Sequence, residues 1–143
     1  MGHIGPWLHG IQALLESDPE ARRRALAEGE AQLANCVSHN HIFLREVAID
    51  AALDGGDWEA VAAHADKLRR YTADEPLPLS DFIIARGHAL ARFGQGERGD
   101  DLRTPLDDLA RLATGAEMNV ARAAIDAARQ KLPQPTRTPG PAT

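Results

Sequence analysis

Residues 48–68, AIDAALDGGDWEAVAAHADKL, decide the fold class of this chain. Small apolar residues dominate the first half, Gly55 and Gly56 interrupt the stretch, and Asp57 precedes the second half. Glycines commonly end helices and aspartate caps the helix that follows, so the stretch predicts two helices joined by a tight turn. The second helix has one apolar face, formed by Trp58, Val61, Ala62, Ala65 and Leu68. The opposite face, which we expect to contact solvent, carries Glu59, His64, Lys67 and Arg70.

Apolar residues recur every three or four positions on both sides of this stretch, which predicts further helices. In chain order we expect a first helix that ends near Ser17, then helices over about 19–35, 41–53 and 81–93, one that starts near Asp100, and one over 118–132. The residues expected to face inward from the first helix are Ile4, Trp7, Leu8, Ile11, Leu14 and Leu15. Trp7 and Trp58 are accordingly expected in the core.

Other residues are expected to set helix ends and polar faces. Asp18, ahead of a proline, predicts an N-cap. Ser38 and Asn40 offer capping oxygens for the third helix, and Pro105 is expected in the first turn of the sixth, because proline lacks an amide hydrogen. The three arginines at 22–24 predict a solvated helix face.

The composition fits a single helical domain. The chain has 143 residues, of which 43% are hydrophobic but only 4% aromatic, so the core must consist mainly of Ala, Leu, Ile and Val. We expect one domain over 1–132. The tail at 133–143 contains four prolines and no apolar periodicity, which predicts disorder.

The charge pattern excludes several classes of partner. Sixteen basic and 21 acidic residues are interspersed, giving a formal charge of -5, so the chain offers no basic surface for nucleic acid. It contains no long apolar run or signal peptide, which predicts no membrane association. The single Cys36 fits a reducing compartment. These features predict a cytoplasmic protein, and the Ala, Arg, Gly and Asp content suggests a bacterial one.

The helices predict a repeated unit. Gly56 and Gly94, which both end helices, are 38 residues apart, the scale of a helical repeat. Three hairpins and a closing helix predict an all-α, right-handed stack of antiparallel helical hairpins, with about seven helices including a C-terminal capping helix. The Gly-Asp-Trp at 56–58 resembles a degenerate tetratricopeptide unit. Gly87 stands where that unit has glycine in its inner helix, whereas Ile49 replaces it in the preceding unit.

A second resemblance covers roughly residues 19–95. The segments ANCVSHNHIFLREVAIDAALDGGDW (34–58) and YTADEPLPLSDFIIARGHALARFG (71–94) are similar to the C-terminal helical-repeat region of large bacterial predicted ATPases of the adenylate-cyclase-associated type. In such proteins the repeats follow a nucleotide cyclase or ATPase portion. The resemblance implies a repeat module from, or related to, a multidomain signalling protein, and it carries no catalytic residue onto this chain.

Two short motifs bear on catalysis or cofactor binding. Residues 94–99 spell GxGxxG, which binds dinucleotides when it joins a strand to a helix. Here it follows a predicted helix, which favours a helix-ending loop over a nucleotide site. Cys36, His39 and His41 carry ligand types suited to zinc, or to a Cys–His nucleophile, but no fourth ligand or orienting group is evident. We therefore predict no cofactor and no enzymatic activity, with metal binding at these three residues left open.

Polar residues on the inner helices suggest a binding surface. In a stack of hairpins the first helix of each pair lines the concave side. The candidate partner-binding residues there are Arg45, Glu46, Asp50, His88 and Arg92.

The leading hypothesis is a non-catalytic protein-interaction module whose concave groove binds a peptide or a neighbouring domain. The alternative is a purely structural or oligomerising segment of a larger bacterial signalling protein of the ATPase or cyclase type. An enzyme is the third interpretation. Exposed ionisable groups on the concave face would favour the first hypothesis, whereas an exposed apolar patch at an end of the stack would favour the second.

Overall fold

The computed structural model describes residues 5–134, which form seven α-helices and one short 3-10 turn and include no strand. This confirms the predicted all-α class. The elements are α1 (Gly5–Leu15), α2 (Pro19–Gln32), the 3-10 turn (Leu33–Asn35), α3 (Ser38–Asp54), α4 (Trp58–Tyr71), α5 (Pro78–Gly94), α6 (Asp100–Gly115) and α7 (Asn119–Gln130). Ile4 and most of the proline-rich tail, residues 135–143, lie outside the described residues.

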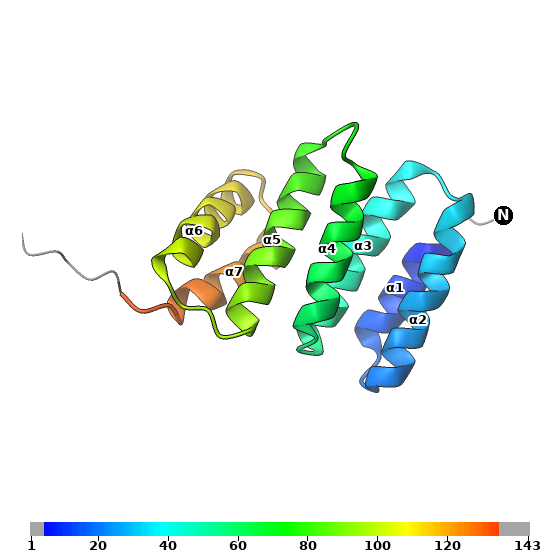
Figure 1. Ribbon diagram of the computed structural model, residues 1–143, viewed down its shortest axis with the longest axis horizontal. Coiled ribbons are helices and arrows are strands. Elements are labelled where there is room, and N and C mark those ends of the chain that lie inside the picture. Colours follow the sequence, from blue (N-terminus) through cyan, green and yellow to red (C-terminus); the bar gives the residue numbers. More distant parts are fainter. Residues whose placement is uncertain (1–4, 135–143) are drawn as a thin grey trace, which may run out of the picture.

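The helices lie side by side along the long axis of the molecule, with α1 and α2 at one end and α6 and α7 at the other (Figure 1). α1 packs against both α2 and α3, α3 packs against α4, and α4 packs against α5. α6 joins the assembly through α5 and α7. Elements close in sequence are therefore close in space, although α3 packs mainly against α1 and only slightly against α2.

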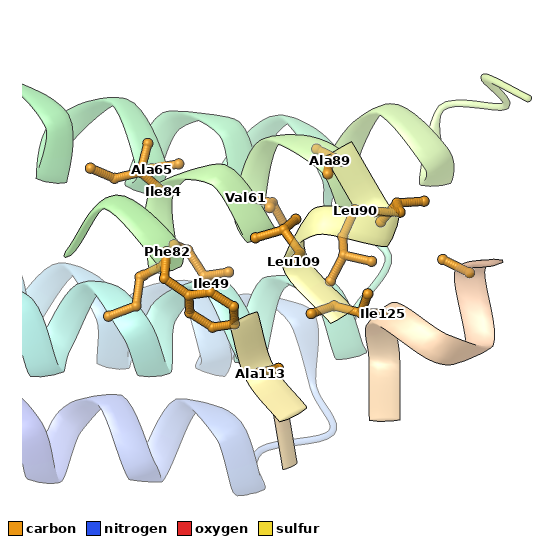
Figure 2. Close-up of a cluster of buried hydrophobic side chains, with 14 of the residues drawn as sticks. Ile49, Val61, Ala65, Phe82, Ile84, Ala89, Leu90, Leu109, Ala113 and Ile125 are labelled. Atoms are coloured by element: carbon orange, nitrogen blue, oxygen red, sulfur yellow. The ribbon is translucent and has the colours of Figure 1, made fainter. Parts of the chain in front are cut away.

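Two groups of buried side chains hold this arrangement together. The larger core joins α3 to α7, with Ile49, Val61, Phe82, Leu109 and Ile125 each coming from a different helix (Figure 2). The smaller core joins α1, α2 and α3 and is built mainly from alanine; its members are Ala13, Ala25, Leu26, Ala48 and Ala51. Small side chains in this second group let the three helices approach one another closely.

Several helix ends agree with the prediction. The Asp18 carboxylate accepts a hydrogen bond from the amide of Ala21 at 2.8 Å, and the Asp57 carboxylate accepts one from the amide of Ala60 at 3.1 Å. Both confirm aspartate N-caps. α5 begins at Pro78, earlier than expected, because proline at the first helical position loses no helical hydrogen bond.

The expected caps of α3 and the expected place of Pro105 are wrong. α3 begins at Ser38, and its N-cap is Val37, which makes no side-chain cap. Asn40 is buried inside the helix. Pro105 is the sixth residue of α6, one turn later than predicted. An amide there would have bonded the carbonyl of Asp101, so only one hydrogen bond near the helix start is missing.

The predicted inward face of α1 is wrong. The buried residues are Pro6, Gly10 and Ala13, which form a narrow stripe of small side chains. A Cβ atom added at Gly10 would lie 3.2 Å from the Cβ of Val47, so α1 and α3 pack closely here and a larger residue would push α3 away. Of the residues predicted to face inward, Ile11 is half-buried, and the exposed ones are Trp7, Leu8, Leu14 and Leu15.

Arg22 does not belong to a solvated face either. Its guanidinium donates hydrogen bonds to the carbonyls of Ala13 at 3.2 Å and Glu16 at 2.7 Å. It also pairs with the carboxylate of Asp54, at 3.0 Å. Because the last carbonyls of a helix lack helical partners, Arg22 caps the end of α1 and ties it to the end of α3.

Gly94, the last residue of α5, packs directly against the indole ring of Trp58 at the start of α4. A Cβ atom there would lie 2.3–2.5 Å from three ring atoms. Gly115 ends α6 in the same way, but a Cβ atom on it would meet nothing within 4 Å. The two glycines therefore differ in the space that a Cβ atom would have.

We expect Gly94→Ala to lower the free energy of unfolding by about 1–2 kcal/mol, because the indole must move. Gly115→Ala should be neutral or stabilise by up to about 1 kcal/mol, since alanine restricts the unfolded chain. Urea denaturation of both variants measures the difference. Repeating Gly94→Ala in a Trp58→Ala background should abolish its cost, and an unchanged cost there would contradict this account.

Candidate functional site

The five residues predicted to bind a partner do not form one cluster. Arg45 lies on a different side of α3 from Glu46 and Asp50, and its side chain is only 8% exposed. It donates hydrogen bonds to Glu30 of α2, at 3.1 Å, and to His64 of α4, at 3.0 Å. Arg45 therefore faces the interior between α2 and α4, away from the expected groove.

Glu46 and Asp50 share one face of α3, as the four-residue spacing predicts. Asp50 accepts a hydrogen bond of 2.6 Å from the buried Arg86 of α5. Burial raises the pKa of Glu46, and the neighbouring charge of Asp50 raises it further against the opposing effect of Arg86. A basic group placed beside Glu46 would favour its charged form.

His88 and Arg92 are each engaged with a carboxylate. The imidazole of His88 lies 3.1 Å from the carboxylate of Asp66, which belongs to α4. Arg92 forms a bidentate pair with Glu97 in the loop after α5. Both side chains remain partly exposed. Asp50, His88 and Arg92 are thus each engaged with a different partner.

The outward face of α1 exposes several large apolar side chains. Leu15 is 81% exposed, Leu8 51% and Trp7 41%. α1 contains no Asp, Glu, Lys or Arg. Several large apolar side chains exposed on one helix face are unusual in a monomer.

This apolar face adjoins the exposed face of α3. Gly10 of α1 meets Val47 of α3, and Leu14 and Trp7 lie about 40° and 60° further around α1, on the side turned away from α2. Phe43 precedes Val47 by one turn, about 40° around α3 from the residue that meets α1, and its side chain is exposed. We call the surface formed by Trp7, Leu8, Leu14, Leu15 and Phe43 the apolar face.

A cavity lies on the opposite side, between α2 and α4. Its volume is about 850 Å³, and α3 contributes to its lining through Ala52. At one end, a single carboxylate oxygen of Glu30 accepts hydrogen bonds from both Arg45, at 3.1 Å, and Lys67, at 2.5 Å. Burial alone would raise the pKa of Glu30, but these hydrogen bonds and the two positive charges outweigh it and lower the pKa to about 2. Glu30 therefore stays ionised.

His64 belongs to the same network, which corrects the prediction that it faces solvent. Its ring is buried, and its Nδ1 atom lies 3.0 Å from the guanidinium of Arg45. A guanidinium can only donate, so Nδ1 accepts and Nε2 carries the proton. Burial, reinforced by the charge of Arg45, lowers the pKa of His64 to about 4. The ring is thus neutral near neutral pH and keeps one N–H donor.

The three residues that could bind a metal each make a contact within the fold. Cys36 donates to the carbonyl of Gln32 at 3.2 Å, His39 meets the edge of Phe43, and His41 stacks on Tyr71 with ring centroids 3.9 Å apart. Within residues 5–134 no three His, Cys, Asp or Glu side chains are arranged to hold a metal ion.

The GxGxxG segment joins two helices. Gly94 ends α5, Gly96 adopts a left-handed φ of +100°, and Gly99 is the N-cap of α6. Without a preceding strand, the loop lacks the surroundings in which this motif holds a dinucleotide.

Neither the apolar face nor the cavity between α2 and α4 was predicted from the sequence. Nor is any helix in the described part of the chain long and apolar enough to cross a membrane. No family model, curated protein or solved structure matches this chain.

Proposed function

We propose that this chain is a non-catalytic protein-interaction module, a tetratricopeptide-like right-handed stack of helical hairpins. The apolar face carries the proposal. α1 packs inward through Pro6, Gly10 and Ala13 and turns its large side chains outward. Covering one such side chain contributes about 1.5–3 kcal/mol, so a partner that covers several gains substantial affinity.

The partner we propose is an amphipathic helix with an apolar face bordered by basic side chains. Helical partners dock through apolar residues spaced three and four apart. Glu46 and Asp50 lie beside Phe43 on α3, so a basic residue at the edge of the bound helix would meet negative charge there. His88 and Arg92 on α5 lie further along and would affect specificity.

A selection from a library of displayed helical peptides tests this proposal. Recovered peptides should combine apolar residues at helical spacing with Lys or Arg. Their affinity, measured by fluorescence anisotropy, should fall at least about tenfold for the double variant Leu8→Glu, Leu15→Glu, because both charges would be buried in the complex. Both positions are exposed, so the fold should survive.

The matched control is the double variant Leu112→Glu, Val120→Glu. These residues are also exposed, at 60% and 86%, but lie on α6 and near the start of α7, at the other end of the molecule. The control should bind the peptides as the wild type does. Peptides without apolar periodicity, or equal losses in both variants, would refute the proposal.

The second candidate function is a structural or oligomerising role. The observation that favours it is the position of the apolar face on α1, at one end of the molecule (Figure 1). Because α1 contains no Asp, Glu, Lys or Arg, two copies could meet there with little charge repulsion. Sedimentation equilibrium separates the two functions. A dimer that Leu8→Glu, Leu15→Glu converts to a monomer would support self-association, whereas a monomeric wild type supports binding of another protein.

A further inference from the structure

Glu46 lies on the part of α3 between its contacts with α1 and α5. Val47 meets Gly10 of α1, and Ile49 approaches Gly87 of α5, where a Cβ atom would lie 3.4 Å from its Cδ1 atom. On a helix with 3.6 residues per turn, Glu46 lies about 100° around α3 from Val47 and about 60° from Ile49, between the two. A partner bound to the apolar face and extending toward α5 would therefore pass over Glu46.

The Glu46 carboxylate has no partner within the fold. Among residues 5–134 it accepts no hydrogen bond and forms no ion pair. The side chain is half-buried, and neither of its oxygens is among the buried polar atoms that lack a partner, so both reach the surface. Burial and the charge of Asp50 oppose its ionisation, and Arg86 offsets them only in part. A cationic group from outside would remove this cost.

Asp50 is already committed to the fold. It accepts a hydrogen bond of 2.6 Å from Arg86, which is only 5% exposed and whose Nε atom has no acceptor. Drawing Asp50 away would leave a buried positive charge unpaired, which is strongly unfavourable. The charges of Asp50 and Arg86 therefore balance each other, and the negative charge of Glu46 remains.

The surrounding elements supply no further positive charge to Glu46. Arg45 turns to the opposite side of α3, and α1 contains no Asp, Glu, Lys or Arg. On α5, His88 and Arg92 are engaged with other carboxylates. His39 shares this face of α3 but lies two turns away, about 10 Å along the helix.

We propose that Glu46 selects a basic side chain in the partner: a Lys or Arg of the bound helix lays its aliphatic part on Phe43 and places its charged end at the Glu46 carboxylate. This inference rests on the proposed function, because the apolar face must hold the partner. Phe43 is 42% exposed and precedes Glu46 by three residues, so the two side chains are neighbours on α3. Long basic side chains commonly cover apolar surface with their stems while the charged end meets a polar group.

The test repeats the selection of displayed helical peptides on Glu46→Gln and Glu46→Lys beside the wild type. Peptides recovered on the wild type should carry Lys or Arg at one position next to their apolar residues. Glu46→Gln should keep the apolar spacing and lose the basic preference, whereas Glu46→Lys should favour Asp or Glu at that position. The matched control is Glu59→Gln, which removes the same charge from an exposed position on α4 and should recover the same peptides as the wild type.

A recovered peptide that contains lysine then measures the effect against a version with norleucine, which keeps the carbon chain without the charge. By fluorescence anisotropy, norleucine should weaken binding to the wild type about tenfold, because a charge-assisted hydrogen bond is lost. On Glu46→Gln the two peptides should bind within about twofold of each other. Thermal unfolding curves confirm that the variants are folded.

The outcomes separate this inference from the proposed function. Apolar peptides without Lys or Arg on the wild type, or the same basic preference on Glu46→Gln, would overturn the role of Glu46 and leave the apolar face as the binding surface. An equal norleucine effect on the wild type and on Glu46→Gln would do the same. Recovery of no peptide with apolar periodicity would refute the proposed function, and this inference with it.

Discussion

Replacing Leu68 with alanine should lower the free energy of unfolding by about 2–5 kcal/mol. Leu68 is fully buried in the larger core, on the inner face of α4. Truncation removes apolar contacts with neighbouring helices and leaves a cavity that close-packed surroundings cannot fill. Domains of this size are stable by only about 5–15 kcal/mol, so the loss is a large share of the total.

Urea unfolding followed by circular dichroism measures this loss. Leu112→Ala is the matched control, because the same atoms are removed from a helix at a position that is 60% exposed. Its effect should stay below about 0.5 kcal/mol. Equal effects at the two positions would mean that the buried face of α4 is misassigned.

Acidification from pH 6.5 to 4 should destabilise the protein by about 2–3 kcal/mol through His64. The pKa of His64 is about 4 in the folded chain, against 6.5 for an ordinary histidine. Between these values the unfolded chain takes up a proton that the folded chain does not, so stability falls as the pH falls. Below about pH 4 His64 is protonated in both the folded and the unfolded chain, so His64 causes no further loss of stability.

The variant His64→Asn should lose this part of the pH dependence, because asparagine keeps an acceptor for Arg45 but does not titrate. Urea denaturation at a series of pH values measures the slope. His39→Asn, on the exposed surface of α3, should retain the wild-type slope. If His64→Asn retains it too, the ring is not held neutral in the folded state. A further loss, as the pH falls from about 4.5 to 2, is expected from Glu30.

The sequence predicts the helices well because their ends carry local signals. Asp18 and Asp57 form hydrogen bonds to amides three residues away, and Pro78 acts through its own ring. The aspartate caps depend only on neighbouring residues, so they can be recognised before any tertiary contact is known. The start of α5 at Pro78 was not recognised, because the helix was expected to begin near Asp81.

The orientation of α1 could not be predicted from apolar spacing. The pattern identifies an apolar face but does not tell whether another helix covers it. The covered face is set by close approach at Gly10 and Ala13, which fit against α3 where leucine would not. The sequence contains this stripe of small residues, but apolar periodicity favours the more hydrophobic side that carries Trp7 and Leu8.

The polar network was missed for a different reason. Glu30, Arg45, His64 and Lys67 come from three helices and are up to 37 residues apart in sequence. Arg45 was placed with Glu46 and Asp50 because all three are polar residues of one helix. Only the packing of α2 and α4 against α3 shows that Arg45 faces inward. Contacts of this kind depend on tertiary structure and leave no periodic signal.

The alanine-rich core beneath α1 and α2 has a consequence for how the molecule opens. Alanine buries less apolar area than leucine or isoleucine, so the N-terminal end is held by weaker forces than the α3–α7 core. Local unfolding should begin where the fewest large side chains are buried. A partner that binds the apolar face would also stabilise the folded α1 and α2. Binding would therefore be weaker whenever these N-terminal helices unfold locally.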